Sequence, residues 1–171
     1  GQATEHNYVG VKCGIMDQFA SVFGKEGCLI KLDCSTMDYE YIPFHPKGYR
    51  VVLVDSKVKH ELVDSPYNRR RESCERVVAE IAKTHPEVKL LADADFAMLE
   101  QVKDAVSQED CMRATYVIGE NNRLATTCAA LQKDDYETVG EMVFATHQGL
   151  SKLYEVSTPE IDFLNELAKG A

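Results

Sequence analysis

The chain has 171 residues, of which 44% are hydrophobic and 27% charged, and this composition is typical of one folded globular domain rather than of a disordered segment. The formal net charge of −9 argues against nucleic-acid binding, which needs an excess of clustered cations. No apolar run is long enough to cross a bilayer, so we expect neither a membrane nor a nucleic acid as a partner.

The cysteines favour a reducing compartment. Six cysteines are scattered without any CxxC pair, and this spacing is atypical of zinc sites and of disulfide frameworks. We therefore expect reduced, mostly buried thiols and a cytoplasmic location. Because the chain starts at Gly1 in a polar stretch rather than at Met, we also expect a processed or excised piece of a longer protein.

The first third of the chain combines one helical pattern with several strand patterns. Residues 14–23 place Ile15, Met16, Phe19, Ala20 and Phe23 on one helical face, and Gly24 is a natural stop. Runs of β-type residues then predict strands at 27–33, 38–44 and 49–55, with 58–63 a further candidate. The run at 49–55 (YRVVLVD) has the continuous apolar character of a buried strand.

Helical patterns occupy the rest of the chain. We expect helices at 67–83, 93–105, 108–132, 135–155 and 159–169, the first opened by Pro66 and the last by the sequence STPE at 157–160. With strands in the first third and helices after, the predicted fold class is α+β. The sequence has no GxGxxG or GxxxxGK[ST] loop, so no nucleotide-binding motif is recognisable.

Asp17 is the first candidate for chemistry. It follows Gly14 and falls in the opening turn of the predicted helix, where backbone amides and the helix dipole favour an ionised carboxylate. That position alone supports two interpretations: a common helix-start residue, or a base that accepts or orients a hydroxyl proton. Gly14 would let a ligand approach the backbone closely.

Other polar residues have an ordinary and a functional interpretation. Glu5 and His6 have the features of solvated surface residues, although one carboxylate can suffice for Mg²⁺ when phosphates supply the other ligands. Three arginines, Arg69, Arg70 and Arg71, lie in the first turn of a predicted helix against its dipole, so we expect acidic groups to compensate them. Tyr67 is either a buried ring or a sugar contact.

Four blocks of sequence, in this order, resemble galactokinases of the GHMP small-molecule kinase superfamily: EHNYVGVKCGIMDQFAS, LIKLDCST, VVLVDSKVKHELVDSPYNRRRESCE and MVFATHQGLSKLYEVSTPEIDFL. The resemblance implies that Asp17 is the catalytic aspartate, which accepts or orients the proton of the galactose 1-hydroxyl as it attacks the γ-phosphate of ATP. It also implies that Gly14, Asp17 and Tyr67 contact the sugar and that Glu5 helps to hold Mg²⁺.

Parts of the family pattern are missing from this sequence. It has no GEHTDY-like sugar motif, no Gly/Ser-rich phosphate loop and no GGGFGG-like motif. The resemblance therefore implies a central to early C-terminal fragment of a two-lobed kinase, with residues 1–60 ending the N-terminal lobe and 61–171 forming a mostly helical part of the C-terminal lobe. We expect no ATP-binding residue in this chain, no activity of the chain alone, and self-association through exposed strand edges.

Two other functions stay open at this stage. One is an N-acetylgalactosamine kinase, with a wider pocket near Gly14 and Tyr67. The other is a galactokinase-like sugar sensor that regulates transcription without catalysis. The presence of both Asp17 and Glu5 argues against the sensor.

Overall fold

The computed structural model of the chain describes residues 1–10, 13–58 and 67–170. Its elements, in chain order, are α1 (Gln2–Thr4), the π-helical turn η1 (Glu5–Val9), α2 (Met16–Phe23), β1 (Cys28–Leu32), β2 (Tyr39–Pro43), α3 (Tyr67–Ile81), the 3-10 turn η2 (Leu91–Asp93), α4 (Phe96–Val102), α5 (Gln108–Leu131), α6 (Tyr136–Lys152) and α7 (Pro159–Lys169). Both strands precede the long helices, which confirms the predicted α+β class.

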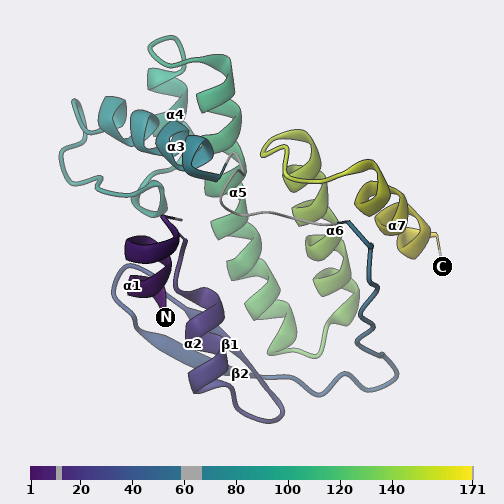
Figure 1. Cartoon of the computed structure of the whole chain (residues 1–171). Helices are drawn as coiled ribbons and strands as arrows, with labels where there is room; N and C mark the ends of the chain where they lie inside the picture. The colour runs from purple at the N-terminus through teal and green to yellow at the C-terminus, as the bar shows by residue number, and fades with distance from the viewer. Residues whose placement is uncertain (11–12, 59–66, 171) are drawn as a thin grey trace.

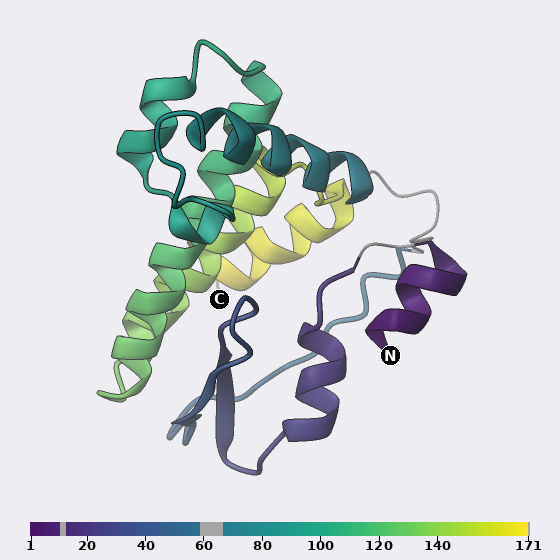
Figure 2. The same cartoon turned by 90° about the vertical axis from the view of Figure 1, so that its left-hand side faces the viewer.

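Helix α5 lies in the middle of the molecule (Figure 1). Helices α3 and α4 pack at one end of it, α6 runs back beside it, and α7 lies outside α6. The β1–β2 hairpin and α2 lie toward the other end of α5, as the turned view also shows (Figure 2). The hairpin is antiparallel, with Cys28 opposite Pro43 and Leu32 opposite Tyr39.

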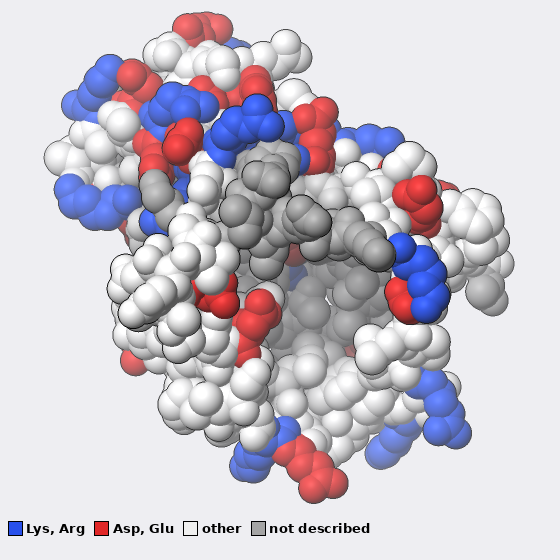
Figure 3. Space-filling model, in the orientation of Figure 1, with Lys and Arg blue, Asp and Glu red and all other residues white. Residues whose placement is uncertain are grey.

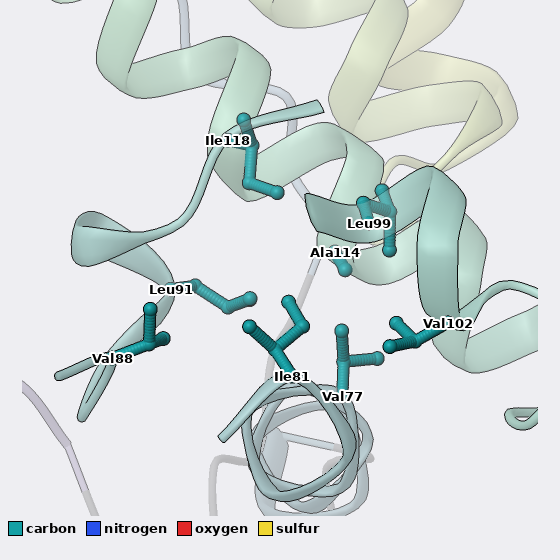
Figure 4. Close-up of a cluster of buried hydrophobic side chains, with 8 residues drawn as sticks. All are labelled: Val77, Ile81, Val88, Leu91, Leu99, Val102, Ala114 and Ile118. Carbon is teal, nitrogen blue, oxygen red and sulfur yellow. The ribbon is translucent and has the colours of Figure 1, made fainter. Parts of the chain in front are cut away.

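The larger core joins α3, η2, α4 and α5 (Figure 4). Apolar residues recur at helical spacing on facing surfaces, such as Val77 and Ile81 on α3 and Ala114 and Ile118 on α5. Burying one such side chain stabilises the fold by roughly 1.5–3 kcal/mol. The cluster consists of Val77, Ile81, Val88, Leu91, Leu99, Val102, Ala114 and Ile118.

A smaller core attaches the hairpin to the helices. Ile42 of β2 is only 2% exposed and packs against Cys128 and Leu131 of α5. On the other side of the hairpin, the ring of Tyr39 lies 5.2 Å from that of Phe19 on α2, measured between centroids. The hairpin is therefore held between α2 and α5.

Most of the predicted elements are confirmed with small shifts of their ends. The predicted helix 14–23 is α2, and the strands predicted at 27–33 and 38–44 are β1 and β2. The predicted opening of the last helix is also confirmed, because the Thr158 side chain accepts a hydrogen bond from the Ile161 amide at 3.4 Å. Helix α4 is shorter than predicted and starts after Asp95, whose side chain caps it.

The predicted buried strand at 49–55 is wrong. These residues form no strand, and the side chains of Val51, Val52, Leu53 and Val54 are 72%, 73%, 95% and 64% exposed. A strand with two apolar faces needs neighbours on its edges and faces, and β1 and β2 are the only strands among the described residues. Of the further candidate at 58–63, Val58 is in no strand and 59–63 lie outside the described residues.

The cysteines differ from one expectation. All six cysteines are free, but only Cys128 is buried and Cys34 is exposed, so the expectation of mostly buried thiols is wrong. In the described part of the chain, no helix combines the length and apolar character needed to span a membrane.

One buried carboxylate links α3 to α5. Asp110, whose side chain is 6% exposed, accepts hydrogen bonds from Arg76 Nε at 3.1 Å and Nη2 at 2.7 Å. Arg76 Nη2 also donates to Ser73 Oγ at 3.0 Å. The hydrogen bonds from Arg76 hold the pKa of Asp110 well below its ordinary value.

We predict that Asp110→Asn lowers the free energy of unfolding at pH 7 by about 2 kcal/mol, since Arg76 loses a charged acceptor. A carboxylate with a lowered pKa in the folded state stabilises it above the unfolded pKa, near 3.9, and loses this contribution as the pH falls through the folded pKa. The gap between wild type and variant should therefore shrink below about pH 4.

Urea unfolding between pH 2.5 and 7 measures this gap. The control is Asp104→Asn, which changes an exposed carboxylate in the turn before α5. If the free energy of unfolding depended on pH equally in the two variants, the stabilising role of the ionised Asp110 would be contradicted.

Candidate active site

Asp17 lies in the first turn of α2, as predicted. Its side chain is exposed and makes no hydrogen bond or ion pair with the described residues, whereas its backbone carbonyl accepts from Ser21 Oγ at 2.8 Å. Asp17 is thus an accessible carboxylate that can accept or orient a proton.

The backbone at Gly14 is open. Gly14 is exposed and does not adopt the left-handed conformation that favours glycine. A Cβ at this position would meet nothing within 4 Å, so neither strain nor packing explains the glycine. The missing side chain leaves space for a ligand beside the backbone, three residues before Asp17.

Glu5 begins the π-helical turn η1. This turn ends at Gly10, which has φ +77° and donates its N–H to the Glu5 carbonyl. The Glu5 side chain is half-buried and has no hydrogen bond or ion pair to the residues that the structure describes. One free carboxylate fits Mg²⁺ that takes its other ligands from phosphates and water. No group of three or more His, Cys, Asp or Glu side chains in the described ranges is arranged to hold a metal.

Two side chains converge on the carbonyl of Cys13. His6 Nε2 lies 2.9 Å from this oxygen and Gln2 Nε2 lies 3.2 Å from it, and both nitrogens must donate because a carbonyl only accepts. His6 was predicted to be a surface residue and is exposed, but its contact with the Cys13 carbonyl was not predicted. The i, i+4 spacing of Gln2 and His6, which places both on one helical face, was the available signal.

Tyr67, the fourth predicted site residue, comes from a different part of the chain. It is the first residue of α3 and is 37% exposed. In both ribbon views the start of α3 lies near the segment that leads into α2 (Figures 1 and 2). Figure 3 shows this face hollowed in its middle, with acidic side chains on the rim formed by the N-terminal elements and a mixture of basic and acidic side chains over α3 and α4.

The arginine run has mainly structural partners. Arg71 pairs with Glu75 at 2.9 Å, which confirms compensation by a protein carboxylate for this residue. Arg70 instead donates to backbone carbonyls, from Nε to Tyr154 at 2.6 Å and from Nη2 to Glu155. Arg69 is exposed and lines a cavity of about 390 Å³ between α3, α5 and the segment after α6.

Arg113 holds the same segment from α5. It is 3% exposed and donates from Nη1 to the Leu153 carbonyl and from Nη2 to Glu155 Oε2 at 2.5 Å. This hydrogen bond and the charge of Arg113 lower the pKa of Glu155. Glu155 has φ +52°, an unusual conformation for a residue with a side chain, and the two arginines fix it.

The chain is similar to galactokinases over nearly all of its length. It is 43% identical to the galactokinase of Thermotoga maritima over 166 residues, which cover 97% of this chain and 45% of that protein. It is 37% identical to the galactokinase of Homo sapiens over 167 residues, which cover 98% of this chain and 41% of that protein. No protein-family model matches the chain.

The fold gives the same result. A crystal structure of Lactococcus lactis galactokinase complexed with galactose matches with a TM-score of 0.90 at 31% identity, covering 99% of this chain and 44% of that one. The resemblance to galactokinases is confirmed, and the chain spans less than half the length of these relatives. This coverage agrees with the expected correspondence to one part of a galactokinase.

Proposed function

We propose that this chain supplies the catalytic aspartate and part of the sugar site of a galactokinase, which transfers the γ-phosphate of ATP to the 1-hydroxyl of galactose. The observation that carries the proposal is the 0.90 TM-score to a galactose-bound galactokinase at 31% identity. Asp17 supports it, because it is exposed at a helix start and pairs with none of the described residues, so its carboxylate can engage a substrate hydroxyl.

The proposed roles come from the resemblance to galactokinases, and the exposure of the residues supports them. Asp17 orients the 1-hydroxyl and accepts its proton late in the transfer. Gly14 leaves room for the sugar beside the backbone, and Tyr67 offers an aromatic face and a hydroxyl. Phosphoryl transfer depends mainly on positioning and charge neutralisation, so a small set of side chains is sufficient.

Glu5 is the proposed ligand for Mg²⁺, which would neutralise charge on the phosphates of ATP. Its half-buried carboxylate makes no hydrogen bond or ion pair with the described residues, and this supports the role. The sequence has no recognisable phosphate loop, so we propose that ATP is held by parts of the kinase that this chain does not include. We also propose that residues 1–60 end the N-terminal lobe, that 61–171 form part of the C-terminal lobe, and that the kinase acts in the cytoplasm.

We predict that the 171-residue chain alone has no galactokinase activity, since it lacks a phosphate loop. A coupled ADP-release assay with galactose, ATP and Mg²⁺ measures this directly. The positive control is a chimera in which this chain replaces the matching segment of the Thermotoga maritima galactokinase. Turnover by the chain alone would show that the expectation is wrong.

Within that chimera, we predict that Asp17→Asn lowers kcat about 100-fold or more, because the hydroxyl loses its proton acceptor. Stability should change by less than about 0.5 kcal/mol, since the side chain is exposed and unpaired. Steady-state kinetics and thermal melting measure the two effects. Glu26→Gln, which changes another exposed carboxylate, is the matched control. Turnover of Asp17→Asn within a few-fold of wild type would remove the catalytic role.

The same chimera distinguishes galactose from N-acetylgalactosamine as the substrate, and a kinase from a sugar sensor. Phosphorylation of galactose supports the proposal, whereas a preference for N-acetylgalactosamine would indicate the related kinase. Galactose binding without phosphorylation of either sugar would indicate the sensor.

We further propose that the isolated chain self-associates through residues 51–54, whose consecutive exposed apolar side chains form a surface rarely left uncovered. Sedimentation velocity at increasing concentration should detect dimers or larger species. Leu53→Lys should shift the chain toward monomer, because a charge on an exposed apolar segment opposes pairing. Val22→Lys on α2, at a position that is 74% exposed, is the control. Concentration-independent monomers would refute this proposal.

A further inference from the structure

The carbonyl of Cys13 connects two proposed functional groups. On one side it accepts hydrogen bonds from His6 and Gln2, which belong to η1 and α1. On the other side it directly precedes Gly14, and α2 with Asp17 begins three residues later. His6 itself follows Glu5 in η1. The hydrogen bond from His6 to the Cys13 carbonyl therefore links two residues of the proposed site. His6 follows Glu5, the proposed metal ligand, and Cys13 precedes Gly14, the proposed sugar contact.

We propose that His6 is a positioning residue, which sets the separation of Glu5 and Asp17 by holding the Cys13 carbonyl; this inference rests on the proposed function. The N-cap residue of α2, Ile15, makes no side-chain capping bond, so among the described residues His6 and Gln2 are the side chains that hold the backbone just before α2. The orientation of the first turn of α2, and of Asp17 on it, thus depends on where the preceding carbonyl is fixed.

His6 is better suited to this role than Gln2. Its hydrogen bond is shorter, 2.9 Å against 3.2 Å. An imidazole has only two side-chain torsions to fix, whereas a glutamine side chain has three.

The hydrogen bond is tested in the 171-residue chain. The ¹³C shift of the Cys13 carbonyl should move upfield in His6→Leu, which has no donor, and return toward wild type in His6→Gln, whose amide can donate from the position of Nε2. His6→Asn, whose amide is too short to reach, is the second donorless variant if His6→Leu does not fold. The control His85→Leu removes a histidine that contacts Gln101 at 3.3 Å in the helical part and should leave the shift unchanged.

The positioning role is tested in the chimera with Thermotoga maritima galactokinase. His6→Leu should lower kcat by about 10- to 100-fold, as expected when reacting groups are displaced by about 1 Å. KM for galactose should change less than about threefold, because the sugar contacts themselves remain, and His6→Gln should recover most of kcat. A merely structural residue would change the melting temperature without this split between kcat and KM.

The outcomes separate the two proposals. An unchanged Cys13 carbonyl shift in His6→Leu, or equal kcat in wild type and His6→Leu, overturns the positioning role while wild-type activity upholds the proposed function. A folded wild-type chimera that phosphorylates no sugar overturns the proposed function and the catalytic consequence of His6 together. In that case the carbonyl shift still shows whether the hydrogen bond itself was correctly assigned.

Discussion

The arrangement of the candidate site depends on the burial of Ile42 against Cys128 and Leu131. This contact, from β2 to the far part of α5, joins the hairpin to the helices, and Phe19 and Tyr39 in turn join α2 to the hairpin. Asp17 on α2 is therefore placed relative to the helical half through these apolar contacts and through the hydrogen bond from Tyr41 Oη to the Phe23 carbonyl at 2.8 Å. Because interiors are close-packed, a small cavity at Ile42 would be transmitted as a displacement of α2.

Local sequence patterns predicted a helix or strand correctly where residues of this chain stabilise that element. Asp17 was placed correctly because the helix around it has its own apolar face, and β1 and β2 form because they pair with each other. The run at 49–55 failed for the opposite reason, since its two apolar faces have no described strand beside them. A strand pattern indicates that a segment can be buried, but it does not indicate whether neighbouring strands are present to bury it.

Tertiary hydrogen bonds were the part that the sequence did not reveal. His6 was predicted to be a surface residue, and Arg70 was predicted to pair with an acidic group. Both side chains bind backbone carbonyls. A backbone acceptor is present at every residue, so residue type alone cannot identify which carbonyl a side chain will reach. The sequence pattern therefore indicated the positions of Asp17 and Tyr67, but not the hydrogen bonds of His6 and Arg70 that fix the backbone near them.

The arginine contacts explain how the second half of the site is fixed. Tyr67 begins α3, and Arg70, one turn later on the same helix, is bonded to the carbonyls of Tyr154 and Glu155. Arg113 holds the same segment from α5, so the start of α3 is tied to the end of α6. Asp17 is thus positioned through the hairpin and Tyr67 through Arg70 and the buried Arg113, and both routes reach α5. A sugar that contacts both residues would bridge two separately anchored parts of the fold, and its binding would then depend on the apolar docking at Ile42 as much as on the contact residues.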